Sequence, residues 1–244
     1  MMATQMPLRF GLVGISGRMG REMVVLAAID PLLTVVGRFG SRNAGELRDL
    51  ASNCDVLIDF STPESSATAA SAAAESGTPL VFGTTGLDAD QVALLRATSV
   101  RAPVWFARNM STGVSLLQRL LPEIARALEG YDIELIEAHH RHKVDAPSGT
   151  ALMLAEAIVA GLPGADEHPL VHGREGHAPR QPGEIGIHAV RGGGNPGEHA
   201  ILFASNEEEI RITHRAYSRQ AFAAGAIRAA RAIHGQPPGW YGPE

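Results

Sequence analysis

The N-terminal part of the chain alternates between short apolar segments and amphipathic stretches, and this alternation constrains the fold more than any other feature. Five apolar segments are expected to be strands, and they span residues 8–13, 33–37, 54–60, 79–82 and 103–107. Helical patterns fill the intervals, and strands that alternate with helices at this spacing form βαβ units around a parallel sheet. The sequence therefore predicts a Rossmann-type, doubly wound α/β domain.

Local signals predict where two of these helices begin. The tetrapeptide Ser61-Thr62-Pro63-Glu64 should start a helix, with Thr62 as the cap, Pro63 in the first turn and Glu64 near the positive end of the helix dipole. Another helix is expected to begin at Leu87.

The pattern changes after Thr112. A helix, a strand and a second helix come first, a loop rich in Gly and Pro follows, and three closely spaced strands are then expected at 184–190, 198–204 and 209–216. Such short connections favour antiparallel pairing, and alternation of Ile212 and His214 with Thr213 predicts a sheet with one buried face. We therefore expect a dinucleotide-binding domain (1–111, completed by 219–244) and a smaller α+β substrate domain (112–218) with a mixed or antiparallel sheet that is open on one face.

Three glycines stand where the first strand leads into the first helix. Gly14, Gly17 and Gly20 form the pattern G-x-x-G-x-x-G, with Ser16 at the position where the common dinucleotide fingerprint has its second glycine. Glycines at such a junction let a pyrophosphate approach the backbone and the helix N-terminus. An ordinary tight turn would give a similar pattern, so the motif alone leaves both interpretations open.

The end of the second predicted strand bears on the choice of cofactor. An NAD-specific site has an acidic residue there to bind the ribose 2′-hydroxyl, whereas this segment has no acid before Glu46. Arg38 and Arg42 flank the neutral Ser41 and are suited to a 2′-phosphate. We expect NADPH to bind at least as well as NADH, with a solvent-exposed basic turn as the alternative interpretation.

The segment from Glu137 to Ala151 has the highest density of chemically active side chains. Three histidines, an arginine and Lys143 fall within five positions, and the turn Pro147-Ser148-Gly149-Thr150 follows. A strong helix former comes next, and a helix N-terminus offers free N–H groups to an anion. The segment predicts a site for carboxylates or phosphates with groups that transfer protons. A zinc site is the alternative, but the only cysteine is Cys54.

This segment resembles the signature of bacterial dihydrodipicolinate reductases in its order Glu-Ala-His-His-x-x-Lys-x-Asp-Ala-Pro-Ser-Gly-Thr-Ala, and the Gly-Arg-Met-Gly run at 17–20 is also typical of that family. The resemblance extends over nearly the whole chain. It implies NAD(P)H-dependent reduction of 4-hydroxy-2,3,4,5-tetrahydrodipicolinate to 2,3,4,5-tetrahydrodipicolinate, a step of lysine and diaminopimelate biosynthesis. It also implies a cytoplasmic homotetramer.

The resemblance further implies roles for individual residues. His139 and Lys143 would be catalytic. Apart from the resemblance, Glu137 would orient His139 if the strand geometry brings the two side chains together. Substrate would be bound by His140, Ser148, Gly149, Thr150 and Arg219. The cofactor would be bound by Gly14, Ile15, Ser16, Gly17, Arg18, Met19, Arg38, Ser41, Arg42, Phe60, Gly83, Thr84, Thr85, Ala107, Arg108, Asn109 and Met110. Arg108 and Met110 depart from the residues common in the family, and no metal site is implied.

Composition argues against other classes of function. The net charge is −5 without a basic run, which disfavours nucleic acid as a partner. No run of eighteen apolar residues occurs, so no membrane span is expected. A single cysteine excludes an internal disulfide and fits a reducing cytoplasm.

Two alternative functions remain at this stage. A related dehydrogenase of an amino- or imino-dicarboxylate would share the nucleotide-binding half but lack the His-His-x-x-Lys segment. A nucleotide-sensing binding protein would need no proton donor such as Lys143, and would often add a pair of DNA-binding helices.

Overall fold

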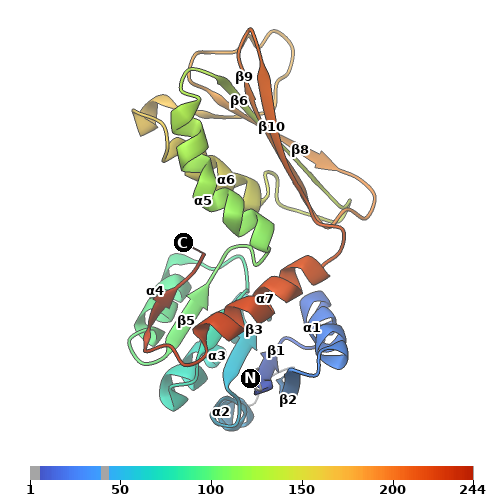
Figure 1. The fold of residues 1–244 in the computed structure, drawn as a ribbon, viewed down its shortest axis with the longest axis vertical. Coiled ribbons are helices and arrows are strands. Elements are labelled where there is room, and N and C mark those ends of the chain that lie inside the picture. Colours follow the sequence, from blue (N-terminus) through green and yellow to red (C-terminus); the bar gives the residue numbers. More distant parts are fainter. Residues whose placement is uncertain (1–5, 40–43, 244) are drawn as a thin grey trace, which may run out of the picture. The chain divides into compact units, whose positions relative to one another are not determined.

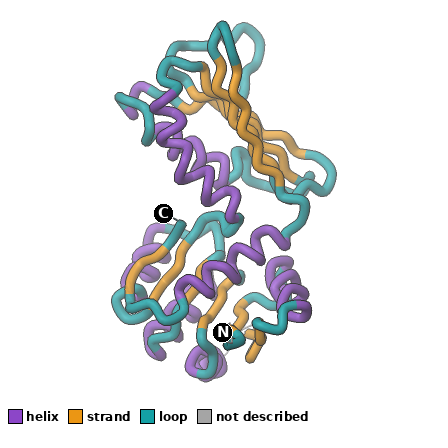
Figure 2. Tube along the Cα trace, viewed as in Figure 1, coloured by secondary structure: helices purple, strands orange, loops and turns teal. Residues whose placement is uncertain are grey.

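A computed structural model describes residues 6–39 and 44–243. The chain divides into two compact units. We call residues 6–112 and 219–243 the nucleotide-binding unit, and residues 113–218 the substrate unit. Figure 1 labels their elements along the chain, and Figure 2 shows the helices and strands of each unit in separate colours.

The nucleotide-binding unit is built on a six-stranded parallel sheet with the order β11-β5-β4-β3-β1-β2. Its elements are β1 (Leu8–Val13), α1 (Arg18–Ile29), β2 (Leu33–Phe39), α2 (Ala44–Ser52), β3 (Val56–Asp59), α3 (Pro63–Ser76), β4 (Leu80–Phe82), α4 (Ala89–Thr98), β5 (Pro103–Phe106), α7 (Gln220–Ile233) and β11 (Gly239–Tyr241). The predicted Rossmann-type fold is thereby confirmed. Strand order reverses between β1 and β3, where ligands bind in sheets of this kind.

Both faces of this sheet are buried, which explains why its strands are continuous apolar runs. On β1, Phe10 and Leu12 belong to the core under α1 and α7, whereas Val13 belongs to the core under α2 and α3. Val56 and Leu57 of β3 divide in the same way. Helices therefore cover both faces of the sheet, and packing in the two cores holds the strands in place.

Helix starts in this unit differ from the expected ones in two places. Thr62 occupies the cap position of α3, but its side chain makes no capping hydrogen bond and its hydroxyl donates instead to Ser65. The helix expected from Leu87 begins at Ala89, because Asp88 forms a capping box with Gln91.

The proline-rich tail adds the edge strand β11. Its three residues pair in parallel with β5. Trp240 packs against Phe106 at a ring separation of 5.4 Å, and the guanidinium of Arg96 stacks on Trp240 at 3.8 Å. Aromatic packing thus stabilises a strand that is too short to be held by its own hydrogen bonds.

The substrate unit contains a five-stranded mixed sheet with the order β10-β9-β6-β8-β7. Its elements are α5 (Thr112–Ala127), β6 (Asp132–His139), α6 (Gly149–Val159), a 3₁₀ turn (Ala165–Glu167), β7 (Leu170–His172), β8 (Ile185–Arg191), β9 (Glu198–Ala204) and β10 (Glu209–Arg215). The expectation that β8 and β9 pair is wrong, because β6 lies between them, parallel to β8 and antiparallel to β9. The predicted loop at 161–182 also contains the short strand β7.

Both helices of the substrate unit lie on one side of its sheet (Figure 2). Leu135, Ile187 and Phe203 point into the core that these helices cover. The opposite face exposes Ile136 and Val190, with 38% and 51% of their surface accessible. The sheet is therefore open on one face, as predicted, and this face is partly apolar.

None of the described helices is long and apolar enough to cross a membrane.

A glycine in α7 gives a test of the packing in the nucleotide-binding unit. A Cβ on Gly225 would lie 1.6 Å from the carbonyl oxygen of Met110. Alanine normally favours a helix by about 1 kcal/mol over glycine, but the helix would have to move here. We expect Gly225→Ala to lower the free energy of unfolding by roughly 1–3 kcal/mol.

Urea denaturation followed by tryptophan fluorescence measures this effect, because both tryptophans, Trp105 and Trp240, belong to the nucleotide-binding unit. Ala224→Ser is the matched control on the exposed side of the same helix, and should cost no more than about 0.7 kcal/mol. A stabilised Gly225→Ala protein would contradict the packing described.

Candidate active site

The glycine motif forms a tight turn at the strand-order reversal. Gly14 has a φ of +86°, and a Cβ on it would lie 2.3 Å from the carbonyl oxygen of Phe60. Gly17 precedes α1 and donates its N–H to the Gly14 carbonyl at 3.0 Å. The first turn of α1 has no acidic residue, so its positive end is available to an anion.

A small cavity lies beside this turn. It has a volume of about 150 Å³ and is lined by Val13, Gly14, Ser16, Gly17, Phe39, Phe60, Ser61, Thr62 and Ser65. These residues come from the carboxyl ends of β1, β2 and β3, and from the start of α3. A dinucleotide phosphate fits this combination of free backbone, small side chains and helix N-terminus.

The other residues expected at the cofactor lie at the same edge of the sheet or outside the described part of the chain. Arg38 is exposed near the end of β2, whereas Ser41 and Arg42 fall outside the described residues. Residues 83–85 follow β4, and 107–110 follow β5. Met110 is buried in the core, so its side chain faces the protein interior.

A buried carboxyl that sequence reasoning missed lies beneath these loops. Asp59 ends β3 with no exposed surface, and its Oδ1 accepts the N–H of Ser61 at 2.9 Å. Burial raises the pKa of Asp59, against hydrogen bonds that include those from Ser61. The sequence did contain a signal for this residue, because Asp59 is an acidic residue at the end of an apolar strand, at the edge of the sheet where ligands bind.

In the substrate unit, the end of β6 carries an acid–base pair. Glu137 and His139 are two residues apart, so they project from the same face of the strand. The imidazole Nδ1 of His139 lies 2.5 Å from Oε2 of Glu137, and both residues are buried. The carboxylate therefore fixes the imidazole and favours a proton on Nδ1. Nε2 faces the backbone of Gly197, where a Cβ would lie 3.0 Å from it.

Glu137 is held by more than this histidine. Its carboxylate accepts the Ser148 N–H at 3.0 Å and two hydrogen bonds from Arg191, at 2.8 and 2.6 Å. Burial opposes the charge, but the hydrogen bonds from His139, Arg191 and Ser148 outweigh it and lower the pKa of Glu137 to about 2. The group is a fixed anion at neutral pH.

Two further histidines extend the site across the sheet. The ring of His199 meets that of His139 edge-on at 5.2 Å, and its Nε2 lies 3.2 Å from the Ser148 hydroxyl. Burial lowers the pKa of His199 to about 3, so the ring is neutral. Burial lowers the pKa of His214 as well. Sequence reasoning missed Arg191 and His199, although His199 lies two residues before Ile201, on the buried face of β9.

The loop after β6 carries the remaining basic groups. The Nζ of Lys143 lies 2.8 Å from Oδ1 of Asp145, and the backbone of His140 bonds to that of Asn195 at 2.8 Å. Lys143 is the only lysine among 21 cationic residues of the chain. The ammonium group of Lys143 and the Glu137–His139 pair thus occur within one short segment.

The expected anion site at α6 has the geometry of a capped helix start. Ser148 is the cap, and its hydroxyl accepts the N–H of Ala151 at 3.1 Å. The Ser148 N–H is occupied by Glu137, and the Asp145 carboxylate accepts a hydrogen bond from the backbone of Gly149. Arg219 precedes α7 in the nucleotide-binding unit, where burial and the neighbouring Arg18 lower its pKa.

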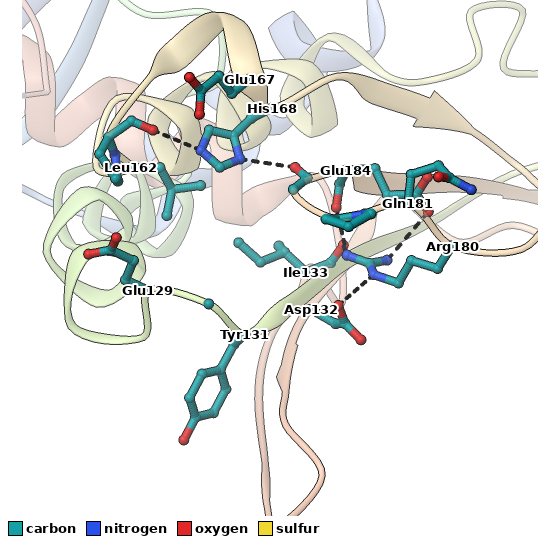
Figure 3. Close-up of a pocket in the computed structure, with 14 residues that line it drawn as sticks. Glu129, Tyr131, Asp132, Ile133, Leu162, Glu167, His168, Arg180, Gln181 and Glu184 are labelled. Atoms are coloured by element: carbon teal, nitrogen blue, oxygen red, sulfur yellow. Dashed lines mark hydrogen bonds and ion pairs between the residues drawn. The ribbon is translucent and has the colours of Figure 1, made fainter.

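A larger cavity lies at the other end of the same sheet (Figure 3). Its volume is about 590 Å³, and it contains none of the predicted site residues. The Arg180 side chain there binds Asp132 at 2.7 Å, and both ring nitrogens of His168 contact backbone carbonyls. These groups are engaged with the protein itself. Among the described residues, no cluster of three or more His, Cys, Asp or Glu is arranged to hold a metal ion.

Two family models cover most of the sequence. Residues 8–110 match the N-terminal part of dihydrodipicolinate reductase, and residues 113–244 match its C-terminal part. The chain belongs to the dihydrodipicolinate reductase family. The 4-hydroxy-tetrahydrodipicolinate reductase of Thermomicrobium roseum is 48% identical over 96% of this chain and 97% of that protein. The enzyme of the same name from Halorhodospira halophila is 43% identical, with 97% of each chain covered.

Solved structures show the same fold at lower identity. A dihydrodipicolinate reductase with bound dipicolinate, from Paenisporosarcina sp. TG-14, matches with a TM-score of 0.75 at 23% identity. The match covers 97% of this chain and 98% of that one. Scyllo-inositol dehydrogenase from Lactobacillus casei, with bound NAD(H) and scyllo-inositol, has a TM-score of 0.58 at 11% identity and covers 93% and 88%.

Proposed function

We propose that the protein reduces 4-hydroxy-2,3,4,5-tetrahydrodipicolinate to 2,3,4,5-tetrahydrodipicolinate with NADPH or NADH, as a cytoplasmic enzyme of lysine and diaminopimelate biosynthesis. The buried Glu137–His139 pair, next to a loop with the only lysine, is the observation that carries this proposal. Membership of the reductase family over nearly the full chain supports it.

The substrate unit would bind the dicarboxylate through two anion sites. One consists of the backbone N–H groups of Gly149 and Thr150 with the hydroxyls of Ser148 and Thr150, at the positive end of α6. The other consists of His140 and Lys143. Because Lys143 is paired with Asp145, a substrate carboxylate would replace that pairing. Arg219 would add a further positive charge.

The nucleotide-binding unit would hold the cofactor at the glycine turn, with Phe60 and the loops after β4 and β5 around it. When bound, the reduced nicotinamide supplies a hydride. The exposed Arg38 and the residues Ser41 and Arg42 would receive a 2′-phosphate, so NADPH is expected to bind at least as well as NADH.

Proton transfer would fall to Lys143 and His139. All the other cationic residues of the chain, histidines aside, are arginines. A guanidinium stays protonated in proteins, whereas an ammonium can release a proton. Lys143 therefore protonates the reduced ring and stabilises its developing charge. His139, oriented through Nδ1, acts as acid or base while water is eliminated.

A direct assay tests this function. Enzymatically prepared 4-hydroxy-tetrahydrodipicolinate is supplied with NADPH or NADH, and oxidation of the nicotinamide is followed by its absorbance. Turnover with this substrate is expected. Its absence from folded protein, together with turnover of another amino- or imino-dicarboxylate, would reject the proposed substrate.

The cofactor assignment predicts a selective effect. Replacing Arg38 and Arg42 together by alanine should weaken NADPH binding by about 1–3 kcal/mol, because charge-assisted hydrogen bonds to the 2′-phosphate are lost. Binding of NADH should hardly change. Titration calorimetry with both cofactors measures the difference, and equal losses for the two would refute the role of these arginines.

The chemical assignment predicts that His139→Gln and Lys143→Ala each lower turnover roughly a hundredfold or more. Lys143→Arg should lose as much as Lys143→Ala, because it keeps the charge but cannot deliver the proton. Cofactor affinity, measured separately, should stay near that of the natural protein. The control is His172→Gln, an exposed histidine on β7. Near-normal turnover of Lys143→Arg would mean that Lys143 only supplies charge.

Assembly gives a further prediction. We propose that the open face of the substrate-unit sheet joins four copies, because it exposes Ile136 and Val190 on adjacent strands. Ile136→Glu should dissociate the tetramer as measured by light scattering at micromolar concentration. Ile29→Glu, at an exposed apolar residue of α1, is the control and should remain tetrameric. A natural protein that is monomeric under these conditions would exclude the proposal.

A further inference from the structure

Arg191 connects three parts of the candidate active site. It ends β8 and lies opposite His139 in the parallel register of β6 and β8. Its guanidinium donates to both carboxylate oxygens of Glu137 and, at 2.7 Å, to the backbone carbonyl of Asp145 in the loop that carries Lys143. Only 19% of the Arg191 side chain is exposed, so water screens these contacts little.

The electrostatic consequence concerns the histidine. A buried carboxylate beside an imidazole strongly favours the imidazolium, because the cation compensates the buried charge. A histidine held permanently as a cation would be a poor proton carrier near neutral pH. Arg191 supplies a counter-charge to Glu137 through two hydrogen bonds, so the carboxylate does not depend on His139 alone.

We propose that Arg191 is a positioning residue for proton transfer: it neutralises Glu137, so that Glu137 orients His139 without trapping it as an imidazolium, and it holds the Lys143 loop through Asp145. The inference rests on the proposed function, since it gives His139 the proton-transfer role assigned above. It adds a determinant of the protonation state of His139 that is contributed by a different strand.

The groups around His139 show which cation compensates the charge of Glu137. The charged or titratable groups near it include Glu137, Arg191, His199, Lys143, Asp145 and the adjacent His140, and His214 lies beyond His199. His199 is neutral because burial lowers its pKa to about 3, and burial lowers the pKa of His214. Lys143 and Asp145 compensate each other at 2.8 Å. Among the described residues, Arg191 is therefore the fixed cation in contact with Glu137.

Histidine ¹⁵N NMR tests the proposal without substrate. The resonances of His139 are assigned by their loss in His139→Gln, and its tautomer and pKa are followed by pH titration of the free protein. In Arg191→Gln the pKa of His139 should rise by roughly 1–2 units, because an uncompensated carboxylate then faces it. In Glu137→Gln it should fall below that of the natural protein, because the cation remains and the anion is gone.

Arg191→Lys separates charge from geometry. A lysine keeps the positive charge but cannot make the paired hydrogen bonds, so the His139 pKa should stay close to its natural value while turnover falls. The pH profile of kcat in Arg191→Gln should move to higher pH by the same interval as the NMR titration. Arg119→Gln, at an exposed arginine of α5, should alter neither.

The outcomes discriminate between the possibilities. An unchanged or lowered His139 pKa in folded Arg191→Gln would overturn the inference. If that variant does not fold, Arg191→Lys and Glu137→Gln provide the test: the inference fails if Arg191→Lys keeps full turnover or if Glu137→Gln leaves the titration of His139 unchanged. If the variants change the His139 pKa as expected but the natural protein has no reductase activity, the proposed function is rejected and the electrostatic link stands.

Discussion

The buried carboxylate of Glu137 organises the substrate unit. It has no exposed surface, yet it is ionised at neutral pH, because hydrogen bonds from His139, Arg191 and Ser148 outweigh the cost of burial. These donors come from β6, β8 and the residue that caps α6. Removing any one of them leaves the charge less compensated in a place that water does not reach. The carboxylate thus links the register of the sheet, the start of the helix and the orientation of the histidine.

The chain can build this arrangement because β6 and β8 are parallel neighbours. Parallel pairing aligns the carboxyl ends of the two strands, so Arg191 arrives beside His139 although the two are far apart in sequence. Antiparallel pairing of β9 with β6 brings His199 to the same end from the other side. The connection through α6 then places a helix N-terminus beside the same strand ends. Cations and N–H donors thus converge at one end of the sheet.

Features with a local cause were predictable from the sequence, and features set by long-range pairing were not. The apolar runs around Phe10 and Leu57 predicted a sheet buried on both faces, because continuous hydrophobicity requires it. The partnership of Glu137 with His139 was expected only if the strand brought them together, and the two-residue spacing does so because strand side chains alternate. The partnership with Arg191 depends on which strand lies next to β6, and spacing alone suggested a different order. Strands β7 and β11 escaped notice because each has only three residues and obtains its stability from neighbours.

The distribution of cations separates two kinds of chemistry in the site. Arg191 supplies a charge that does not titrate, and its planar group matches the two oxygens of Glu137. Lys143 lies in the loop after β6 and is paired with the half-exposed Asp145, which a substrate carboxylate would replace under the proposed function. A guanidinium at position 143 would bind an anion but keep its proton, and an ammonium at position 191 would lose the paired geometry. Under the proposed function, the movable proton belongs to the single lysine and the fixed charge to Arg191, in a chain whose other cationic residues are all arginines.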